Sequence, residues 1–357
     1  MKRILCLIES LGSGGAERQL SGLAVMLKQR GYEVEVWYYI KQEFYLPFLK
    51  ENGVCGRYLS NAAKPRKRFF VLRKHIKAFK PDTIISYSAS PSMIACLLKC
   101  LGSAFHLIVS ERSTTQTITN RVKLRFFLYR WASHIVPNSS SQEVFIKQQF
   151  PKLKDKVSVI HNYVDTGLFT PSSDELPFDD ETKIICVGRL VLPKNIPNFI
   201  LAIAKVINKG YKVKVDWFGQ DLYDDYSSEC YKTLKEQSIS NVFTFHEPSA
   251  FIQEEYTKAD VFCLPSIYEG FPNVLCEAMS CGLPVLCSDV CDNPNIIQDG
   301  ENGLLFDPYS VEDIADTIIR FINLDIDTKK TMGEKSRQIA LSCFSPDSFI
   351  NKYIAIL

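Results

Sequence analysis

The sequence predicts an α/β protein of two domains, each built from parallel strands that alternate with helices. The chain has 357 residues, which exceeds one ordinary core and suits two domains of about 150–180 residues. Short apolar runs alternate with apolar repeats of helical spacing along the chain. A segment rich in Pro, Ser and acidic residues, 170–182, interrupts this alternation. We therefore expect domains at 1–170 and 171–345.

The first half opens with a strand–helix–strand unit. An apolar run at 2–8 leads into the glycine-rich turn 12–15, a helical repeat follows, and 33–39 alternates as a second strand. This βαβ pattern predicts a right-handed parallel sheet. The turn reads G-S-G-G rather than GxGxxG, and no acidic residue closes the second strand, so a nicotinamide cofactor is disfavoured. Further strands are expected at 83–87, 106–110, 135–138 and 157–161.

Residues 62–81 contain eight Lys or Arg and no acidic residue. Phe69, Leu72, Ile76 and Phe79 recur at helical spacing, which predicts an amphipathic helix with a basic face. A second basic and aromatic stretch lies at 121–131. These features favour an anionic membrane surface, whereas the alternative is an ordinary solvated helix face. The candidate membrane and acceptor contacts are Arg66, Lys67, Arg68, Arg73 and Lys74.

Charge is divided unevenly between the two halves. Residues 1–170 contain 26 Lys/Arg and 11 Asp/Glu, a balance of +15, and residues 171–357 contain the other 16 and 29, a balance of −13. The basic half predicts a polyanionic or membrane-bound partner, or attraction to the acidic half. The apolar interleaving and the acidic second half argue against nucleic-acid binding.

The twelve cysteines indicate reduced, buried thiols and a cytoplasmic location. Their spacing matches no zinc motif, and no carboxylate pair suited to Mg²⁺ lies in a strand-end loop, so we expect no metal. The first apolar run is too short for a signal peptide, and 92–109 reads as helix, turn and strand rather than a membrane span. Any membrane contact is expected to be peripheral.

The second half repeats the strand–helix pattern around 269–284. A strand at 260–265 leads into a loop, a helix that begins near Asn273, and another strand from Val285. Pro272 suits the first helical position, and the free N–H groups of this helix suit a phosphate. Two carboxylates, Glu269 and Glu277, flank that position. A ligand with both phosphates and hydroxyls, such as a sugar nucleotide, satisfies both features.

An earlier loop supplies the cations for such a ligand. Arg189 and Lys194 follow the strand at 184–187, where Arg can bind a phosphate through two hydrogen bonds and Lys through a mobile ammonium. With the helix N-terminus they would stabilise a departing nucleoside diphosphate without a metal.

Five motifs together resemble family 4 glycosyltransferases, the large retaining family of GT-B fold, over nearly the whole chain. They are Gly14-Gly15-Ala16-Glu17-Arg18, Gly188-Arg189-Leu190 with Lys194-Asn195, Glu269 and Glu277 in E-G-F-P-N-V-L-C-E, G-L-P-V, and D-G-E-N-G-L-L-F. The resemblance implies two Rossmann-like domains that face each other across a deep cleft. It also implies an acceptor-binding first domain, a donor-binding second domain, and a last helix, 346–357, that packs back onto the first.

The resemblance also implies the role of each matching residue. Arg189 and Lys194 bind the donor diphosphate, Glu269 lies near the sugar hydroxyls, and Glu277 holds the ribose. The implied donor contacts further include Gly14, Gly15, Gly188, Gly219, Gly270, Phe271, Pro272, Asn273 and Val274. Arg112 stands where many members carry a His that contacts the donor sugar. Arg cannot act as a base at neutral pH, which leaves a charge-stabilising role for Arg112 open. Asn295 stands where members often carry Glu.

The implied reaction transfers a sugar with retention from a nucleotide sugar, UDP-linked by family habit, to a hydroxyl. The acceptor is a glycan or polyprenyl-diphosphate-linked glycan in bacterial lipopolysaccharide, capsule or other polysaccharide synthesis, at the inner face of the membrane. No cofactor is expected. The alternatives are a UDP-sugar 2-epimerase of the same architecture and a non-catalytic sugar-nucleotide-binding protein.

Overall fold

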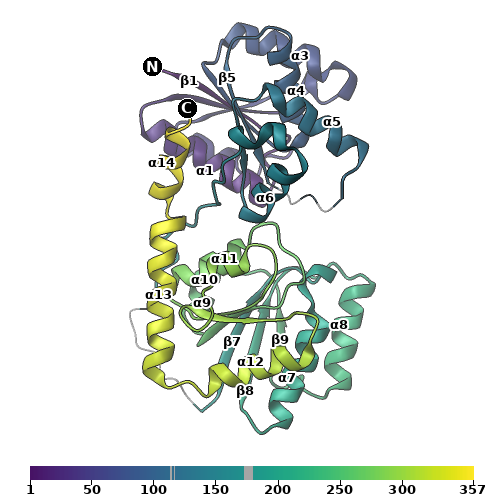
Figure 1. Cartoon of the computed structure of the whole chain (residues 1–357), viewed down its shortest axis with the longest axis vertical. Helices are drawn as coiled ribbons and strands as arrows, with labels where there is room; N and C mark the ends of the chain where they lie inside the picture. Colours follow the sequence, from purple (N-terminus) through teal and green to yellow (C-terminus); the bar gives the residue numbers. More distant parts are fainter. Residues whose placement is uncertain (113–114, 116, 173–179) are drawn as a thin grey trace. The chain divides into compact units, whose positions relative to one another are not determined.

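The structure, a computed structural model, describes residues 1–112, 115, 117–172 and 180–357 (Figure 1). The chain forms two compact units, Met1–Tyr163 with Pro346–Leu357, and Val164–Ser345. The division falls earlier than the expected one after residue 170. The reason is local packing: the Val164 N–H donates to the Phe344 carbonyl at 2.8 Å, and the Phe169 carbonyl accepts from Ser280 and Arg337.

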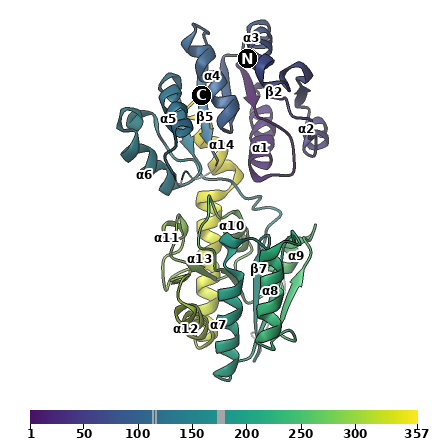
Figure 2. The ribbon, with the colours of Figure 1, turned by 90° about the vertical axis from the view of Figure 1, so that its right-hand side faces the viewer.

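The first unit holds a six-stranded parallel sheet in the order β3-β2-β1-β4-β5-β6. Its strands are β1 (Arg3–Leu7), β2 (Glu33–Tyr38), β3 (Cys55–Tyr58), β4 (Thr83–Tyr87), β5 (His106–Glu111) and β6 (His134–Pro137). Alternate residues of β1 enter different cores: Ile4 and Cys6 lie on one face of the sheet, and Leu5 and Leu7 on the other. Helices cover both faces, which explains why the strands are apolar throughout (Figure 2).

The helices of the first unit include one from the far end of the chain. They are α1 (Gly15–Gln29), α2 (Leu46–Glu51), α3 (Pro65–Phe79), α4 (Ala89–Cys100), α5 (Asn120–Leu128), α6 (Ser140–Gln149) and α14 (Pro346–Ile354), with short 3₁₀ turns η1 (Ser60–Ala62), η2 (Tyr129–Trp131) and η3 (Pro151–Lys156). Phe349, Ile350 and Tyr353 of α14 are buried in the first unit's core. Arg30, the C-cap residue of α1, also pairs with Asp347 at 2.7 Å.

The second unit repeats the same topology. Its sheet has the order β12-β11-β10-β7-β8-β9, all parallel, with strands β7 (Thr182–Val187), β8 (Val213–Phe218), β9 (Phe243–His246), β10 (Val261–Leu264), β11 (Val285–Ser288) and β12 (Gly303–Phe306). Its helices are η4 (Leu192–Lys194), α7 (Ile196–Asn208), α8 (Asp225–Glu236), α9 (Ile252–Tyr256), α10 (Asn273–Ser280), α11 (Asn293–Ile296), α12 (Val311–Ile322) and α13 (Ile326–Phe344).

One predicted strand is wrong. Residues 157–161 form only an isolated bridge, Ile135 to Val157, beside β6. Ser158 and Ile160 donate to carbonyls of Ile135 and Pro137, but Pro137 has no N–H to return a bond. The ladder therefore does not extend. The short strands β3 and β12 were not predicted from the sequence.

In both sheets the strand order reverses at one place, between β1 and β4 and between β7 and β10. Loops that leave the carboxyl ends of these neighbouring strands turn to opposite faces and leave a crevice, which is where open α/β sheets bind ligands. In the second unit this reversal point lies between the loops after β7 and β10. These loops carry Lys194 and Glu269.

Candidate active site

Lys194 and Glu269 meet at the reversal point of the second sheet. The Lys194 Nζ lies 2.6 Å from Glu269 Oε1, and their side chains are only 16% and 14% exposed. The Ser266 hydroxyl donates to the same carboxylate oxygen at 2.7 Å. A carboxylate can accept further bonds and an ammonium has two more protons to donate, so both groups can hold a ligand while paired.

Two glycines let the β7 and β8 loops approach each other closely. A Cβ on Gly219 would lie 1.9 Å from the Gly188 carbonyl oxygen, and a Cβ on Gly188 would lie 2.8 Å from Lys194 Cε. The Gly188 carbonyl also accepts from the Trp217 indole at 2.7 Å. Gly188 and Gly219 therefore fix the path of the loop that presents Arg189 and Lys194.

Arg189 is exposed, unlike Lys194. Among the described residues its guanidinium has no acidic or hydrogen-bonding partner. Asn195 ends the loop in the left-handed conformation, φ 58°, and its side chain donates to the Pro308 carbonyl at 2.7 Å. The turn into α7 is thus fixed, and the Arg189 charge is available to an anion.

The turn before α10 differs from the predicted one by a single position. Pro272 is the N-cap rather than the first helical residue, and its carbonyl accepts from Leu275 and Cys276. The Phe271 side chain is buried and packs against Phe344, with ring centroids 5.9 Å apart. The Asn273 N–H donates to the Phe271 carbonyl at 2.9 Å, so this amide is used within the turn. Gly270 and Val274, on either side, are half-buried.

Glu277 lies beneath the surface of the second unit. Its side chain is buried on α10, and the Tyr256 hydroxyl donates to Oε2 at 3.5 Å. Tyr256 also donates to the Val274 carbonyl at 3.2 Å and so connects α9 to the first turn of α10. Glu269 and Glu277 therefore occupy different environments, one in an ion pair at the crevice and one within the packed helix.

Cys291 and Ser266 support Glu269, and the sequence reasoning overlooked both. The Glu269 N–H donates to Cys291 Sγ at 3.4 Å, and Cys291 has a left-handed backbone, φ 55°. Burial raises the pKa of the Cys291 thiol, which stays protonated at neutral pH. The position of Ser266, directly after a buried strand, is the signal that could have revealed it. All twelve cysteines are free, as predicted, but Cys55, Cys100 and Cys343 are exposed rather than buried.

In the first unit, Gly14 and Gly15 lie at the start of α1, after β1. Gly14 is the N-cap with φ −76° and ψ 164°, and both glycines are exposed. Glu17 turns back over this end and accepts from the Ser10 hydroxyl at 3.1 Å. The backbone here is open to approach, while the Glu17 carboxylate occupies the position next to it.

Arg112 follows β5 and lies within a hydrogen-bonded cluster. Its guanidinium donates to Asn162 Oδ1 at 2.6 Å, to the Tyr353 hydroxyl at 2.6 Å and to the Tyr87 hydroxyl, and it stacks 4.1 Å from the Tyr87 ring centroid. Burial raises the pKa of the Tyr87 phenol, which remains neutral. Arg112 thereby connects α14 to the first sheet. Its role in transfer stays a prediction, and Ser113 and Thr114 lie outside the described residues.

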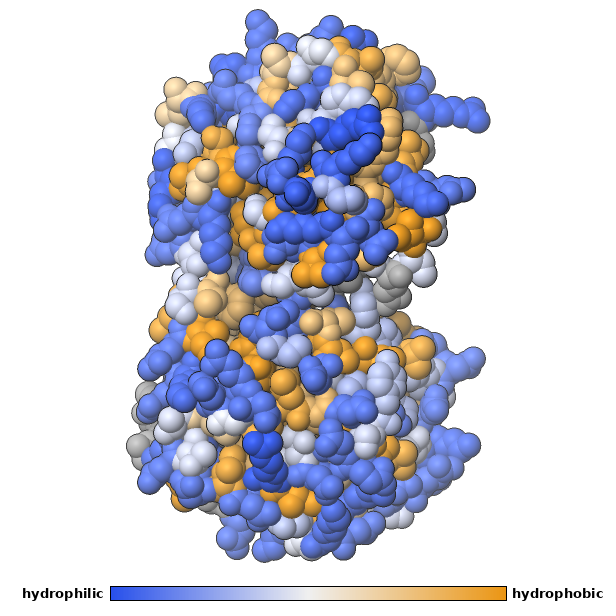
Figure 3. Space-filling view, viewed as in Figure 1, coloured by the Kyte–Doolittle hydropathy of each residue, from blue (hydrophilic) through white to orange (hydrophobic). Residues whose placement is uncertain are grey.

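The basic helix α3 uses its apolar stripe for the core. Leu72 and Ile76 are buried, and Phe69 and Phe79 pack against the same core. Arg68 donates to the carbonyls of Ala62 and Ala63 and to Ser90, and it lies over the Tyr39 ring. Among the candidate membrane contacts, Arg66, Lys67 and Lys74 are exposed and Arg73 is half-exposed. Figure 3 shows hydrophobic side chains at the surface among hydrophilic ones on this unit.

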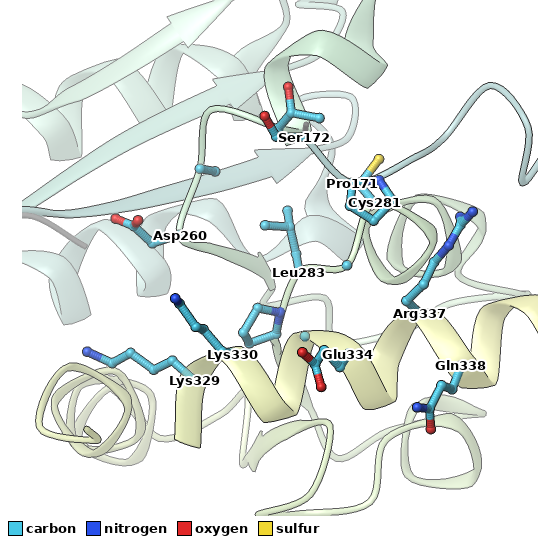
Figure 4. Close-up of a pocket in the computed structure, with 15 residues that line it drawn as sticks. Pro171, Ser172, Asp260, Cys281, Leu283, Lys329, Lys330, Glu334, Arg337 and Gln338 are labelled. Carbon is cyan, nitrogen blue, oxygen red and sulfur yellow. The ribbon is translucent and has the colours of Figure 1, made fainter. Parts of the chain in front are cut away.

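A separate pocket of about 480 Å³ opens at the amino ends of the strands of the second sheet (Figure 4). Its lining comes from residues that precede β10 and β11, such as Asp260 and Leu283, and from α13. Arg337 at its rim donates to the carbonyls of Phe169, Ser280 and Thr166. This pocket lies at the amino ends of the strands, away from Lys194 and Glu269.

Comparison with known families accounts for most of the chain. Residues 13–168 match the model described as Glycosyltransferase Family 4, and residues 170–339 match Glycosyl transferases group 1. The chain belongs to glycosyltransferase family 4. It is a glycosyltransferase, which confirms the resemblance inferred from the motifs.

Two similar curated proteins are bacterial glycosyltransferases. The chain is 28% identical to a Campylobacter jejuni alpha-1,4-N-acetyl-D-galactosaminyltransferase whose named acceptor is an undecaprenol-diphosphate-linked glycan, over 85% of this chain and 84% of the relative. It is 26% identical to the Erwinia amylovora amylovoran biosynthesis glycosyltransferase AmsD, over 87% and 88%. These relatives favour the transferase prediction over the epimerase alternative.

Solved structures establish the GT-B fold. A Rickettsia africae glycosyltransferase aligns with a TM-score of 0.87 at 18% identity, covering 99% of this chain and 97% of that one. Anabaena HepE, solved in complex with UDP, aligns with a TM-score of 0.87 at 20% identity over 99% of both chains. The predicted α/β class with a Rossmann-like sheet in each unit is confirmed.

Proposed function

We propose that this glycosyltransferase takes a sugar from a UDP-sugar and attaches it, with retention, to a hydroxyl of a lipid-linked or cell-surface glycan. The observation that carries the proposal is the paired Lys194 and Glu269 beside an exposed Arg189 at the sheet's reversal point. The names of the relatives, one with an undecaprenol-diphosphate-linked acceptor and one with a role in amylovoran biosynthesis, support the acceptor class. The UDP in HepE supports the donor class.

The cations stabilise the leaving group. Arg189 and Lys194 bind the donor diphosphate, and each charge-assisted hydrogen bond contributes roughly 1.5–3 kcal/mol. Negative charge grows on the diphosphate as the bond to the sugar breaks, so these bonds strengthen in the transition state. No metal is required by this arrangement. The expectation of metal-independent transfer stays a prediction.

The carboxylates orient the donor. Glu269, held by Lys194 and Ser266, accepts hydrogen bonds from sugar hydroxyls. Glu277 accepts from the ribose, which requires the buried side chain to be reached from the α10 turn. The acceptor hydroxyl enters on the face of the leaving group, and a donor phosphate oxygen takes its proton. Gly14 and Gly15 allow the acceptor or diphosphate to approach the start of α1.

The acceptor also implies a membrane location. The exposed Arg66, Lys67 and Lys74 on α3 suit anionic headgroups, so we propose peripheral attachment at the inner face of the membrane. No helix among the described residues is long and apolar enough to span a bilayer. Charge reversal at Arg66, Lys67 and Lys74 tests this, and unchanged binding to anionic vesicles would refute it.

A panel of UDP-, GDP- and dTDP-sugars tests the donor. A ligand of the folded state raises the melting temperature by mass action, so UDP-sugars should shift it and the others should not. The shift should vanish in Lys194→Ala. A larger shift with GDP- or dTDP-sugars would overturn the assignment of UDP, and rapid interconversion of UDP-sugars without acceptor would indicate an epimerase.

A further inference from the structure

The first unit has a second basic feature besides α3. A pocket of about 640 Å³ opens between α5 and the segment around η3. Figure 2 shows α5 close to α6, the helix that leads into η3. Four cationic residues line it: Lys123, Arg130, Lys152 and Lys156. Phe126 and Phe150 stack within its wall, with ring centroids 4.3 Å apart.

The positive charge of this pocket is not neutralised by the protein. No acidic residue lines it, and within the described part of the chain none of the four cations has a carboxylate at ion-pair distance. Asp155 belongs to η3 but does not line the pocket. Four cations around one cavity without a counter-charge predict an anionic ligand.

One of these cations is held in place by neutral groups. Lys156 Nζ donates to the carbonyls of Arg130 at 2.6 Å and Ala132 at 3.0 Å. These bonds fix the ammonium without neutralising its charge. The charge of Lys156 also acts on His134. The pKa of His134 is lowered first by burial and then by the positive charges of Lys156 and Lys99.

Apolar side chains are also exposed on α5, the helix that lines one side of the pocket. Arg130 lies 3.9 Å from the ring centroid of Phe127, and Phe127 is 48% exposed. Leu124, on the same helix, is 51% exposed. Trp131 packs edge-on against Phe127, with centroids 5.7 Å apart. Exposed apolar side chains beside exposed cations that have no counter-charge suit a ligand with a charged head and a hydrocarbon chain.

The position of the pocket separates it from the transfer site. Arg130 and Lys156 come just before β6 and Val157, at the amino end of the first sheet. Gly14 and Arg112 follow the carboxyl ends of β1 and β5. A molecule in this pocket is therefore not the reacting end of the acceptor.

We propose that this pocket binds the phosphate head of an anionic membrane lipid, with the lipid's chain against Phe127 and Leu124. The proposal rests on the proposed membrane attachment and assigns it a specific lipid site. The cations hold the phosphate, and the exposed rings lie at the depth where aromatic side chains enter the headgroup region.

Trp131 provides a direct readout of this site. The chain has three tryptophans, and Trp37 and Trp217 are buried. Vesicles of phosphatidylglycerol with brominated acyl chains should therefore quench Trp131 selectively, and Trp131→Phe should abolish the quenching. Equal quenching by brominated phosphatidylcholine would overturn the role of the anionic head. Release of the protein by inorganic phosphate, at matched ionic strength and at the lipid's concentration, would assign the site to free phosphate instead.

A matched pair of variants separates the pocket from general surface charge. Lys123→Ala with Lys152→Ala removes two pocket cations, and Lys147→Ala with Lys154→Ala removes two charges nearby that do not line it. The first should raise the lipid concentration for half-quenching by about tenfold or more, and the second by less than about threefold. Equal shifts would refute a specific site.

A measurement of donor binding separates a failure of the lipid site from a failure of the proposed function. The thermal shift with UDP-sugar depends on the second unit and should be unchanged in the pocket variants. Loss of lipid quenching with an intact UDP shift supports the pocket alone. Intact quenching without any UDP shift in the wild type would refute the donor proposal and leave the pocket standing.

Discussion

The two units hold their strand-end cations in different ways. In the second unit, Lys194 is paired with one carboxylate and Arg189 has no partner among the described residues. In the first unit, the Arg112 guanidinium donates to two tyrosines and an asparagine. Both arrangements follow a buried strand. A cation in such a loop can bind a ligand only if its partners within the protein leave some of its N–H groups unused. The position of the residue in the sequence does not reveal those partners.

The largest expected effect is at Lys194. Lys194→Ala removes the ammonium that pairs with Glu269, so the diphosphate loses one stabilising donor. Loss of one such donor costs on the order of 10²–10³ in kcat. The measurement is kcat and KM for transfer from a UDP-sugar, with Lys205→Ala as control, because Lys205 pairs with Glu312 on the surface at 2.6 Å. A Lys194 variant that retains most of its kcat would contradict the role in the second unit.

Substitution of Arg112 should lower stability rather than donor binding. Arg112→Met removes three donors from a partly buried cluster and leaves Asn162 and Tyr353 with fewer partners. We expect the free energy of unfolding to fall by about 2–3 kcal/mol while UDP-sugar affinity stays the same. Denaturant unfolding and the thermal shift measure the two quantities. A stable variant that fails in transfer would instead make Arg112 a participant in catalysis.

The glycine contact of the second unit should show a smaller effect. Gly219→Ala places a Cβ on the Gly188 carbonyl, and overpacking of this kind costs about 1–3 kcal/mol. Because the displaced loop carries Arg189 and Lys194, donor affinity should fall as well. Gly210→Ala is the control: it has φ 89° with open space around it, so it strains the backbone without touching the site. Equal donor affinity in both variants would show that the loop position does not matter.

The fold was accessible from the sequence because two signals repeat. Buried parallel strands are apolar throughout, and the helices between them keep one apolar face, so the alternation is visible in both halves. The short strands β3 and β12 were missed for local reasons: β3 reads C-G-R-Y and is only partly buried, and β12 begins at Gly303, the last residue of the turn-like run D-G-E-N-G. The strand at 157–161 was wrongly predicted because its apolar residues are buried beside β6 without a ladder. In residues 157–161 the apolar pattern indicates burial, but it does not indicate hydrogen bonding to a neighbouring strand.

The candidate site was accessible only in part. The loops after β7 and β10 were found because charged residues follow buried strands. The sequence could not show that Lys194 pairs with Glu269, since the two are 75 positions apart. It could not show that Cys291 accepts the Glu269 N–H, because the two residues are 22 positions apart and no pattern connects them. Nor could it show that Arg68 is committed to carbonyls while Arg66 is exposed.

The smallest effect concerns the excess of positive charge on the first unit. Burial lowers the pKa of both His106 and His134, and Lys99 and Lys156 lower that of His134 further. The unfolded chain therefore binds more protons than the folded one as the pH falls through about 6.5, and stability should decrease from pH 7.5 to 5.5. Both side chains are partly solvated, so the melting temperature should fall only modestly. His106→Gln with His134→Gln should flatten this dependence, and salt should weaken it by screening the lysines. A double variant with the same slope would show that the excess charge does not act through these histidines.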